Sequence, residues 1–166
     1  AAEAFRRAIE ADPEYAEAWA WLGEARQQTG GDGRPQLDKA LFLNPQSASV
    51  QALYGLYWLR QGQAEKALAS YGKAAALEPE NAAWQIALGD AASAAGKLSE
   101  AAGYYSRAVD LAPTDPAAWR ALALFSLNHD TDVENTGLVA ARQLLKLAPG
   151  DWLSYDIAGR AAVILR

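Results

Sequence analysis

The chain has 166 residues, with 15 basic and 20 acidic side chains and a formal net charge of −5 at pH 7. Because the basic residues are scattered, the sequence argues against partners such as nucleic acid or a membrane surface, and its apolar runs are far shorter than the roughly 20 residues that cross a bilayer. Cysteine is absent, which excludes disulfides, thiolate nucleophiles and cysteine-based metal sites.

Methionine is absent as well, and the sequence begins at Ala1, so the initiator is missing. We expect either a processed mature chain or a piece of a longer protein. A chain without either sulfur residue resists oxidation, which leans toward an extracellular location. No secretory signal is recognisable, so the localisation stays open.

A unit of about 34 residues recurs along the chain, and such a period is typical of helical repeat proteins. Prolines mark it at steps of 32, 34, 34 and 36 residues: Pro13, Pro45, Pro79, Pro113 and Pro149. Ten residues after each proline stands a glycine or an alanine: Gly23, Gly55, Gly89, Ala123 and Gly159. Each unit therefore predicts two helices, and each proline marks the end of a second helix.

Residues 1–15 predict a single helix. Its apolar residues Phe5, Ala8 and Ile9 recur at steps of three and four, which gives the helix one apolar face. Residues 16–47 predict a helix pair whose turn, TGGDGRP, holds three glycines. No Gly-Lys-Ser/Thr follows these glycines, so we expect a flexible turn and not a phosphate-binding loop.

Residues 48–115 predict two uninterrupted helix pairs of the same length. In the second pair, Asn81 is placed to cap the first helix and Gly96 to end it in the left-handed conformation. We expect Gly89 to leave room for the ring of Tyr105, so that the two helices of the pair approach closely.

Residues 116–151 predict a fourth pair with a longer turn, which contains the acidic sequence DTDVEN. Carboxylates at alternate positions resemble the start of a calcium loop: Asp130, Asp132 and Glu134. The glycine and the closing acid of such a loop are replaced by Asn135 and Ala141. Both a solvated turn and a weak calcium site stay open. Residues 152–166 then predict one last helix.

These patterns resemble the tetratricopeptide repeat (TPR) family. The residues that carry the resemblance are Trp19-x-x-Leu22-Gly23, Trp119-x-x-Leu122-Ala123, Leu88-Gly89, Ala67 with Tyr71 and Ala74, Ala101 with Tyr105 and Ala108, and the recurring prolines. Two aromatic residues, Trp21 and Trp58, fall outside the usual aromatic positions. The resemblance covers the whole chain.

The resemblance implies an all-α, right-handed α-solenoid, with first helices on the concave face and second helices on the convex face. We expect one domain over residues 1–166 with half a repeat at each end. Its segments are 1–15 (the second helix of a split repeat), the repeats 16–47, 48–81, 82–115 and 116–151, and 152–166 (the first helix of a split repeat).

No catalytic constellation is recognisable in the sequence. His129 is the only histidine, so histidine clusters for metal binding or acid–base chemistry are excluded. No Ser/His/Asp triad or pair of carboxylates can be argued. We therefore predict a protein that is not an enzyme, with no cofactor and no metal.

One predicted mode of action is the binding of a peptide or protein segment in the concave groove. By the resemblance, the candidate groove contacts are Glu24, Leu56, Ile86, Asp90, Arg120 and Leu124. Arg120 alone among the groove residues resembles the basic clamps of chaperone-tail binders. We expect an apolar or basic segment as the ligand.

The other predicted mode of action is self-assembly. The segments 1–15 and 152–166 correspond to the two halves of one repeat, so the last helix of one molecule and the first of another would complete it. The predicted contact residues are Phe5, Ala8, Ile9, Tyr155, Ile157, Ala161, Ile164 and Leu165. Because this contact joins two different surfaces, it predicts a head-to-tail filament. The alternative is an adaptor or scaffold, complete or a fragment of a longer protein, that binds a peptide or protein segment in its groove.

Overall fold

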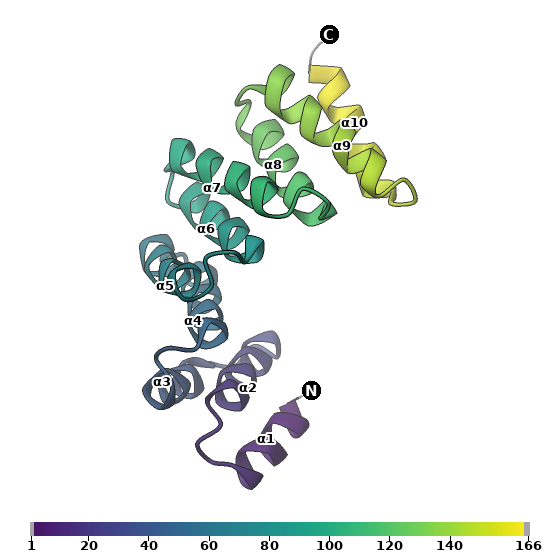
Figure 1. The fold of residues 1–166 in the computed structure, drawn as a ribbon. Coiled ribbons are helices and arrows are strands. Elements are labelled where there is room, and N and C mark those ends of the chain that lie inside the picture. Colours follow the sequence, from purple (N-terminus) through teal and green to yellow (C-terminus); the bar gives the residue numbers. More distant parts are fainter. Residues whose placement is uncertain (1, 165–166) are drawn as a thin grey trace. The chain divides into compact units, whose positions relative to one another are not determined.

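A computed structural model describes residues 2–164, so the predicted contact residue Leu165 lies outside the described part. Within this part every regular element is helical, which confirms the all-α class (Figure 1). The elements are α1 (Ala2–Ala11), α2 (Ala16–Gln28), α3 (Arg34–Leu43), α4 (Ala48–Arg60), α5 (Ala64–Leu77), α6 (Ala82–Ala94), α7 (Leu98–Leu111), α8 (Pro116–His129), the π-helix η1 (Val133–Gly137), α9 (Leu138–Leu147) and α10 (Trp152–Ile164).

Local sequence signals set the ends of several helices. The Asn81 side chain accepts a hydrogen bond from the backbone N–H of Ala83 at 3.1 Å, as predicted for a cap. Asp115 likewise accepts from the N–H of Ala117 at 2.9 Å, just before the proline that opens α8. Gly96 has φ +75°, the left-handed conformation predicted to end α6.

The described chain divides into two compact units. Of the described residues, the first comprises 2–79 and 94–96, and the second comprises 80–93 and 97–164. In the first unit α2 packs on α1, α3 and α4, and α4 packs on α5. Its core includes Ala18, Ala20, Leu37, Val50 and Ala67.

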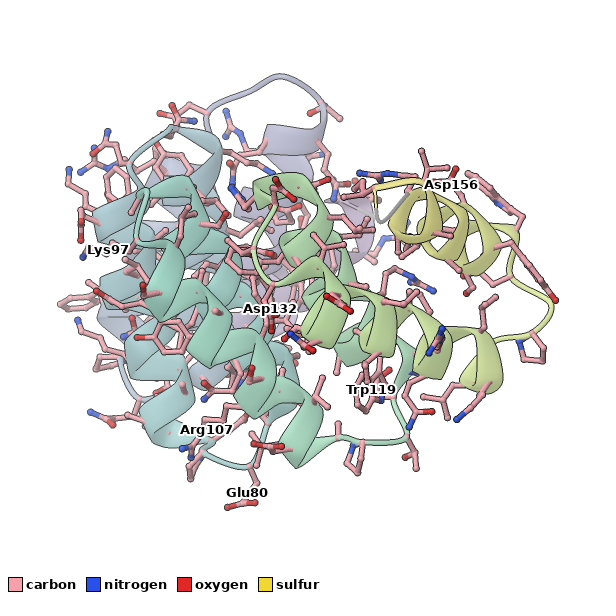
Figure 2. All side chains as sticks on the ribbon, turned by 90° about the horizontal axis from the view of Figure 1, so that it is seen from above. Glu80, Lys97, Arg107, Trp119, Asp132 and Asp156 are labelled. Atoms are coloured by element: carbon pink, nitrogen blue, oxygen red, sulfur yellow. The ribbon has the colours of Figure 1, made fainter. Side chains whose placement is uncertain are left out.

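In the second unit α8 packs on α7 and α9, and α10 packs on both α8 and α9. Its buried side chains include Ala91, Ala108, Ala118, Leu144 and Ile157. The indole N–H of Trp119, which is labelled in Figure 2, donates to the carbonyl of Pro113 at 2.8 Å and so ties the start of α8 to the turn before it.

Glycine lets two of the helix pairs close tightly. A Cβ atom built on Gly89 would lie 2.6 Å from Cε1 of Tyr105, and one built on Gly55 would lie 2.9 Å from the ring of Tyr71. Real Cβ atoms do not come so close to other atoms, so only glycine fits opposite these rings. The predicted pairing of Gly89 with Tyr105 is confirmed.

The long turn of the fourth pair contains the π-helix η1. Asp130 and Asp132 both have positive φ, at 51° and 46°, and the Asp132 carboxylate accepts from Asn135 at 2.8 Å and Thr136 at 2.6 Å. Those two side-chain hydrogen bonds, from Thr136 above all, lower the pKa of Asp132. No group of three metal-ligating side chains forms among the described residues. The geometry therefore gives the calcium alternative no support.

Candidate functional site

Glu24, a predicted groove residue, is already paired inside the chain. Arg60 on α4 donates to both carboxylate oxygens of Glu24 on α2, at 2.6 and 2.9 Å, and Gln28 donates to it at 2.9 Å. Burial opposes ionisation of Glu24 and is the largest single influence, but these hydrogen bonds and the charge of Arg60 outweigh it and lower the pKa of the carboxyl. Glu24 therefore joins α2 to α4.

The charged groove candidates of the second unit are also engaged. Arg120 on α8 donates to Asp151 at 2.8 Å, just before α10. Asp90 on α6 accepts from the hydroxyl of Tyr105 on α7 at 2.6 Å. Burial raises the pKa of Asp90, and the hydrogen bond from Tyr105 partly opposes this rise. The remaining groove candidates are apolar and half-buried: Leu56, Ile86 and Leu124.

Sequence reasoning missed the polar contacts that join residues about one repeat apart. The Oγ atom of Ser93 and the Nε2 atom of His129 lie 2.8 Å apart, and Arg160 donates to the side-chain oxygen of Asn128 at 2.9 Å. Ser47 donates to Glu17 at 2.7 Å. These partners are separated by 36, 32 and 30 residues, close to the repeat period. Complementary polar residues one period apart were the signal that could have revealed them.

Helix α10 has one buried and one open face. The buried face packs within the second unit and holds Ile157 and Ala161, which are fully buried. This differs from the prediction, which placed both residues in an outward stripe, and the reason is that α8 and α9 cover this side of the helix. Of the other predicted residues, Tyr155 and Ile164 are exposed.

The open side of α10, which we call the α10 face, consists of Trp152, Tyr155, Gly159 and Val163. The three large residues are 76, 59 and 68% exposed, and the four recur at steps of three and four along the helix. Nothing lies within 4 Å of a Cβ atom built on Gly159. Sequence reasoning missed three of these residues, although Gly159 shares the register of Gly89 and so marks the side on which a second helix packs.

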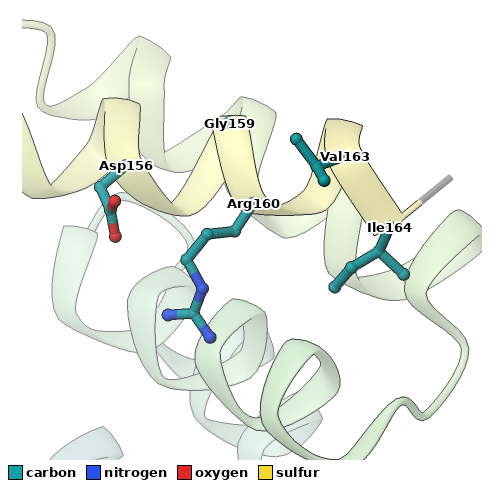
Figure 3. A pocket seen from close by; sticks show the side chains of 5 residues that line it. All are labelled: Asp156, Gly159, Arg160, Val163 and Ile164. Carbon is teal, nitrogen blue, oxygen red and sulfur yellow. The ribbon is translucent and has the colours of Figure 1, made fainter. Parts of the chain in front are cut away.

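A hollow of about 450 Å³ lies along this helix (Figure 3). Its lining residues are Asp156, Gly159, Arg160, Val163 and Ile164. In the α6–α7 pair the matching glycine, Gly89, lies directly under the ring of Tyr105. The hollow is therefore at the position where the closed pair holds an aromatic ring.

Helix α1 is also incompletely covered, although α2 packs against it. None of its residues is buried. Phe5, Ala8 and Ile9, which we call the α1 face, are half-buried, and the Phe5 ring stacks on Trp21 with 6.2 Å between centroids. Ala8 shares the register of Ala108, which is fully buried. The predicted residues of α1 thus lie at register positions that are buried in other second helices, such as that of Ala108.

The repeat signature decides the family. A family model described as the tetratricopeptide repeat matches residues 1–30, 26–76, 59–116 and 86–129. The chain belongs to the TPR family. The resemblance noted in the sequence is confirmed, and the chain has the fold of a protein–protein interaction scaffold. TPR proteins are generally non-catalytic.

Solved structures of TPR proteins share this fold. YrrB, described as a TPR protein with an unusual peptide-binding site, is 23% identical with a TM-score of 0.71 over 99% of this chain and 84% of its own. PilW, described as a widely conserved type IV pilus biogenesis factor, is 19% identical with a TM-score of 0.79 over 96% and 79%. A thermophilic TPR protein from Thermus thermophilus is 21% identical with a TM-score of 0.77 over 99% and 88%.

These similarities are to the fold alone, and they confirm the TPR-like solenoid architecture. A comparison with proteins of curated function finds no match. Within residues 2–164, no helix combines the length and the apolar character that crossing a membrane requires. From the geometry described above, the candidate functional surfaces of this TPR chain are the groove residues, the α1 face and the α10 face.

Proposed function

We propose that this TPR chain is a non-catalytic scaffold that assembles head to tail, with the α1 face of one copy packed on the α10 face of another. The observation that carries the proposal is the empty space at Gly159. The glycines of the same register at Gly55 and Gly89 each lie under an aromatic ring. A helix on the α10 face would close this repeat as α7 closes on α6.

The two faces have matching chemistry. The α10 face presents three exposed apolar side chains around a glycine, and the α1 face presents three apolar side chains that α2 leaves half-exposed. Burying both together removes apolar surface from water, which favours association. Exposed apolar patches of this kind mark interaction sites on soluble proteins.

The geometry of such a contact favours open assemblies. Because the α1 face differs from the α10 face, the contact is heterologous, and each added copy presents a fresh α10 face. Such contacts generate rings or filaments according to whether the rotation between copies closes. We propose a filament, and we expect its length to grow with protein concentration.

A complementation experiment tests the proposal. Val163→Asp should block the α10 face, and Phe5→Asp should block the α1 face, because each places a charge in an apolar contact. Sedimentation velocity should show that each variant alone is monomeric and that an equimolar mixture forms a 1:1 dimer. The wild type should form longer species as its concentration rises.

Val139→Asp is the matched control, since Val139 is an exposed valine on α9 outside both faces. It should assemble like the wild type, and circular dichroism should show that all three variants keep their helices. A wild type that stays monomeric at millimolar concentration, or variants that do not complement one another, would refute head-to-tail assembly.

A second candidate function is the binding of an apolar segment in the groove. The observation that favours it is the in-chain pairing of Glu24, Asp90 and Arg120, which leaves apolar side chains as the available groove contacts. Leu56→Asp should then abolish binding of an apolar peptide measured by calorimetry, and Val139→Asp should not. Binding that survives Leu56→Asp would argue against the groove.

A further inference from the structure

The residues that face each other across a helix pair compensate one another in side-chain size. Opposite Gly55 and Gly89 stand the rings of Tyr71 and Tyr105, and opposite Gly23 stands Leu37, whose Cγ would lie 3.0 Å from a Cβ atom on that glycine. In the fourth repeat the first helix has Ala123 at this register. The large residue eight positions before the proline is replaced there by Ala141, and both alanines are fully buried.

This size exchange predicts what belongs over Gly159. Where the first helix offers glycine, the second helix supplies a large side chain, and where it offers alanine, the second helix supplies a small one. Close packing requires this compensation, because a void or a clash would each destabilise the pair. By this pattern, the side chain that packs over Gly159 should be large.

Phe5 lies at the matching register of α1, eight residues before Pro13, as Tyr105 lies eight residues before Pro113. Because Phe5 already stacks on Trp21, filling the hollow would require its ring to contact two helices at once. Tyr105 fills the space over Gly89 while its ring also lies 5.1 Å from the ring of Phe125 on α8. One ring at this register can therefore contact both the first helix of its own repeat and that of the next.

The polar surroundings of Gly159 are compatible with a phenylalanine ring. Tyr105 donates its hydroxyl hydrogen to Asp90, the residue after Gly89. The residue after Gly159 is Arg160, whose guanidinium has donors and no acceptor. A phenyl ring needs no hydrogen-bond partner, so Phe5 can lie over Gly159 beside Arg160 without an acceptor.

We infer that Phe5 of one copy fills the hollow over Gly159 of the next and thereby specifies the junction. This inference rests on the proposed head-to-tail assembly. The more exposed ring of Phe42 is a poor rival, because α3 already directs Leu37 at Gly23 and has its inner face covered. A second copy is therefore the occupant that this chain itself supplies.

The test uses the two complementary variants, so that a single junction forms. The head donor carries Val163→Asp and contributes its α1 face, and the tail donor carries Phe5→Asp and contributes its α10 face. Titration calorimetry gives the dissociation constant of the mixed dimer. Phe5→Ala in the head donor should weaken binding about tenfold or more, as expected for a central aromatic contact.

Gly159→Leu in the tail donor fills the hollow and should also weaken binding about tenfold or more. Gly103→Leu is its matched control, because Gly103 is an exposed glycine on α7 with nothing within 4 Å of its built Cβ atom, and it should leave binding unchanged. With the Gly159→Leu tail, Phe5→Ala should cost nothing further or even restore binding, because the two side chains compete for one space.

The outcomes separate the inference from the function on which it rests. If the head donor and the tail donor, without any further substitution, form no dimer, the proposal of head-to-tail assembly is wrong. If they form a dimer whose affinity neither Phe5→Ala nor Gly159→Leu changes, or whose two losses simply add, assembly stands and Phe5 is not the residue that fills the hollow. Circular dichroism should show the same helix content for every variant.

Discussion

The α6–α7 pair and helix α10 have a glycine at the same register of the repeat. In the pair this glycine is covered by an aromatic ring (closed), and in α10 it is uncovered (open). In the closed state Gly89 lies under Tyr105, which is only 4% exposed, and the hydroxyl of that ring donates to Asp90. In the open state Gly159 borders a hollow, and its neighbour Tyr155 is exposed. The difference shows that one register can be covered by a ring in one helix and open in another, although α10 packs against α8 and α9.

The largest expected difference concerns the two aromatic rings. Tyr105→Ala should lower the free energy of unfolding by about 3–5 kcal/mol, because it removes a buried ring and leaves a cavity over Gly89. Phe5→Ala should lower the free energy of unfolding by only about 1 kcal/mol, because the half-buried ring of Phe5 removes less apolar surface from water on folding. Urea unfolding at low protein concentration, where copies stay apart, measures both values. Equal losses would mean that the closed and open faces do not differ energetically.

A smaller difference is expected for the two glycines. Gly89→Ala forces a methyl group against the Tyr105 ring, and the resulting overpacking should outweigh the better helix propensity of alanine for a net loss of about 1–2 kcal/mol. Gly159→Ala meets open space and should instead stabilise the monomer by up to about 1 kcal/mol. Thermal unfolding of both variants checks the opposite signs. A loss of stability in Gly159→Ala would contradict the open face.

The smallest effect is a pH dependence that the closed pair should show and that α10 should lack. The pKa of Asp90 is raised in the folded chain, so the unfolded chain loses this proton first as the pH rises. The stability of the wild type should therefore fall, relative to Asp90→Asn, as the pH rises from about 3.9 through the folded pKa. Urea unfolding across this range measures the difference. Arg160→Gln, at the same register of α10, should show no such window.

Much of the fold follows from short-range patterns in the sequence. The apolar periodicity, the prolines and the caps such as Asn81 specify where helices begin and end, because backbone hydrogen bonding and sterics act within a few residues. The opposition of Gly89 and Tyr105 was predictable too, since size must be compensated at a repeated register. These features also place the chain in its family.

The site residues were predicted less well. Tyr155, Ile164 and the α1 residues are open to contact, but Ile157 and Ala161 are buried. Apolar composition alone does not say which side of a helix its neighbours cover. The register of Gly159 carried that information, and it points to the face that also holds Trp152 and Val163. The in-chain partners of the groove charges were not predicted either. Arg60 and Asp151 lie 36 and 31 residues from Glu24 and Arg120, and Tyr105 lies 15 residues from Asp90.

By itself, then, the sequence determined the helices, the repeat and the family, because each depends on residues within one or two turns or one period of each other. Only the tertiary structure decided which face of α10 is covered and that Glu24, Asp90 and Arg120 have partners within the chain. The physical reason is that burial and charge pairing depend on which surfaces of separate helices come into contact, and this follows from packing in three dimensions.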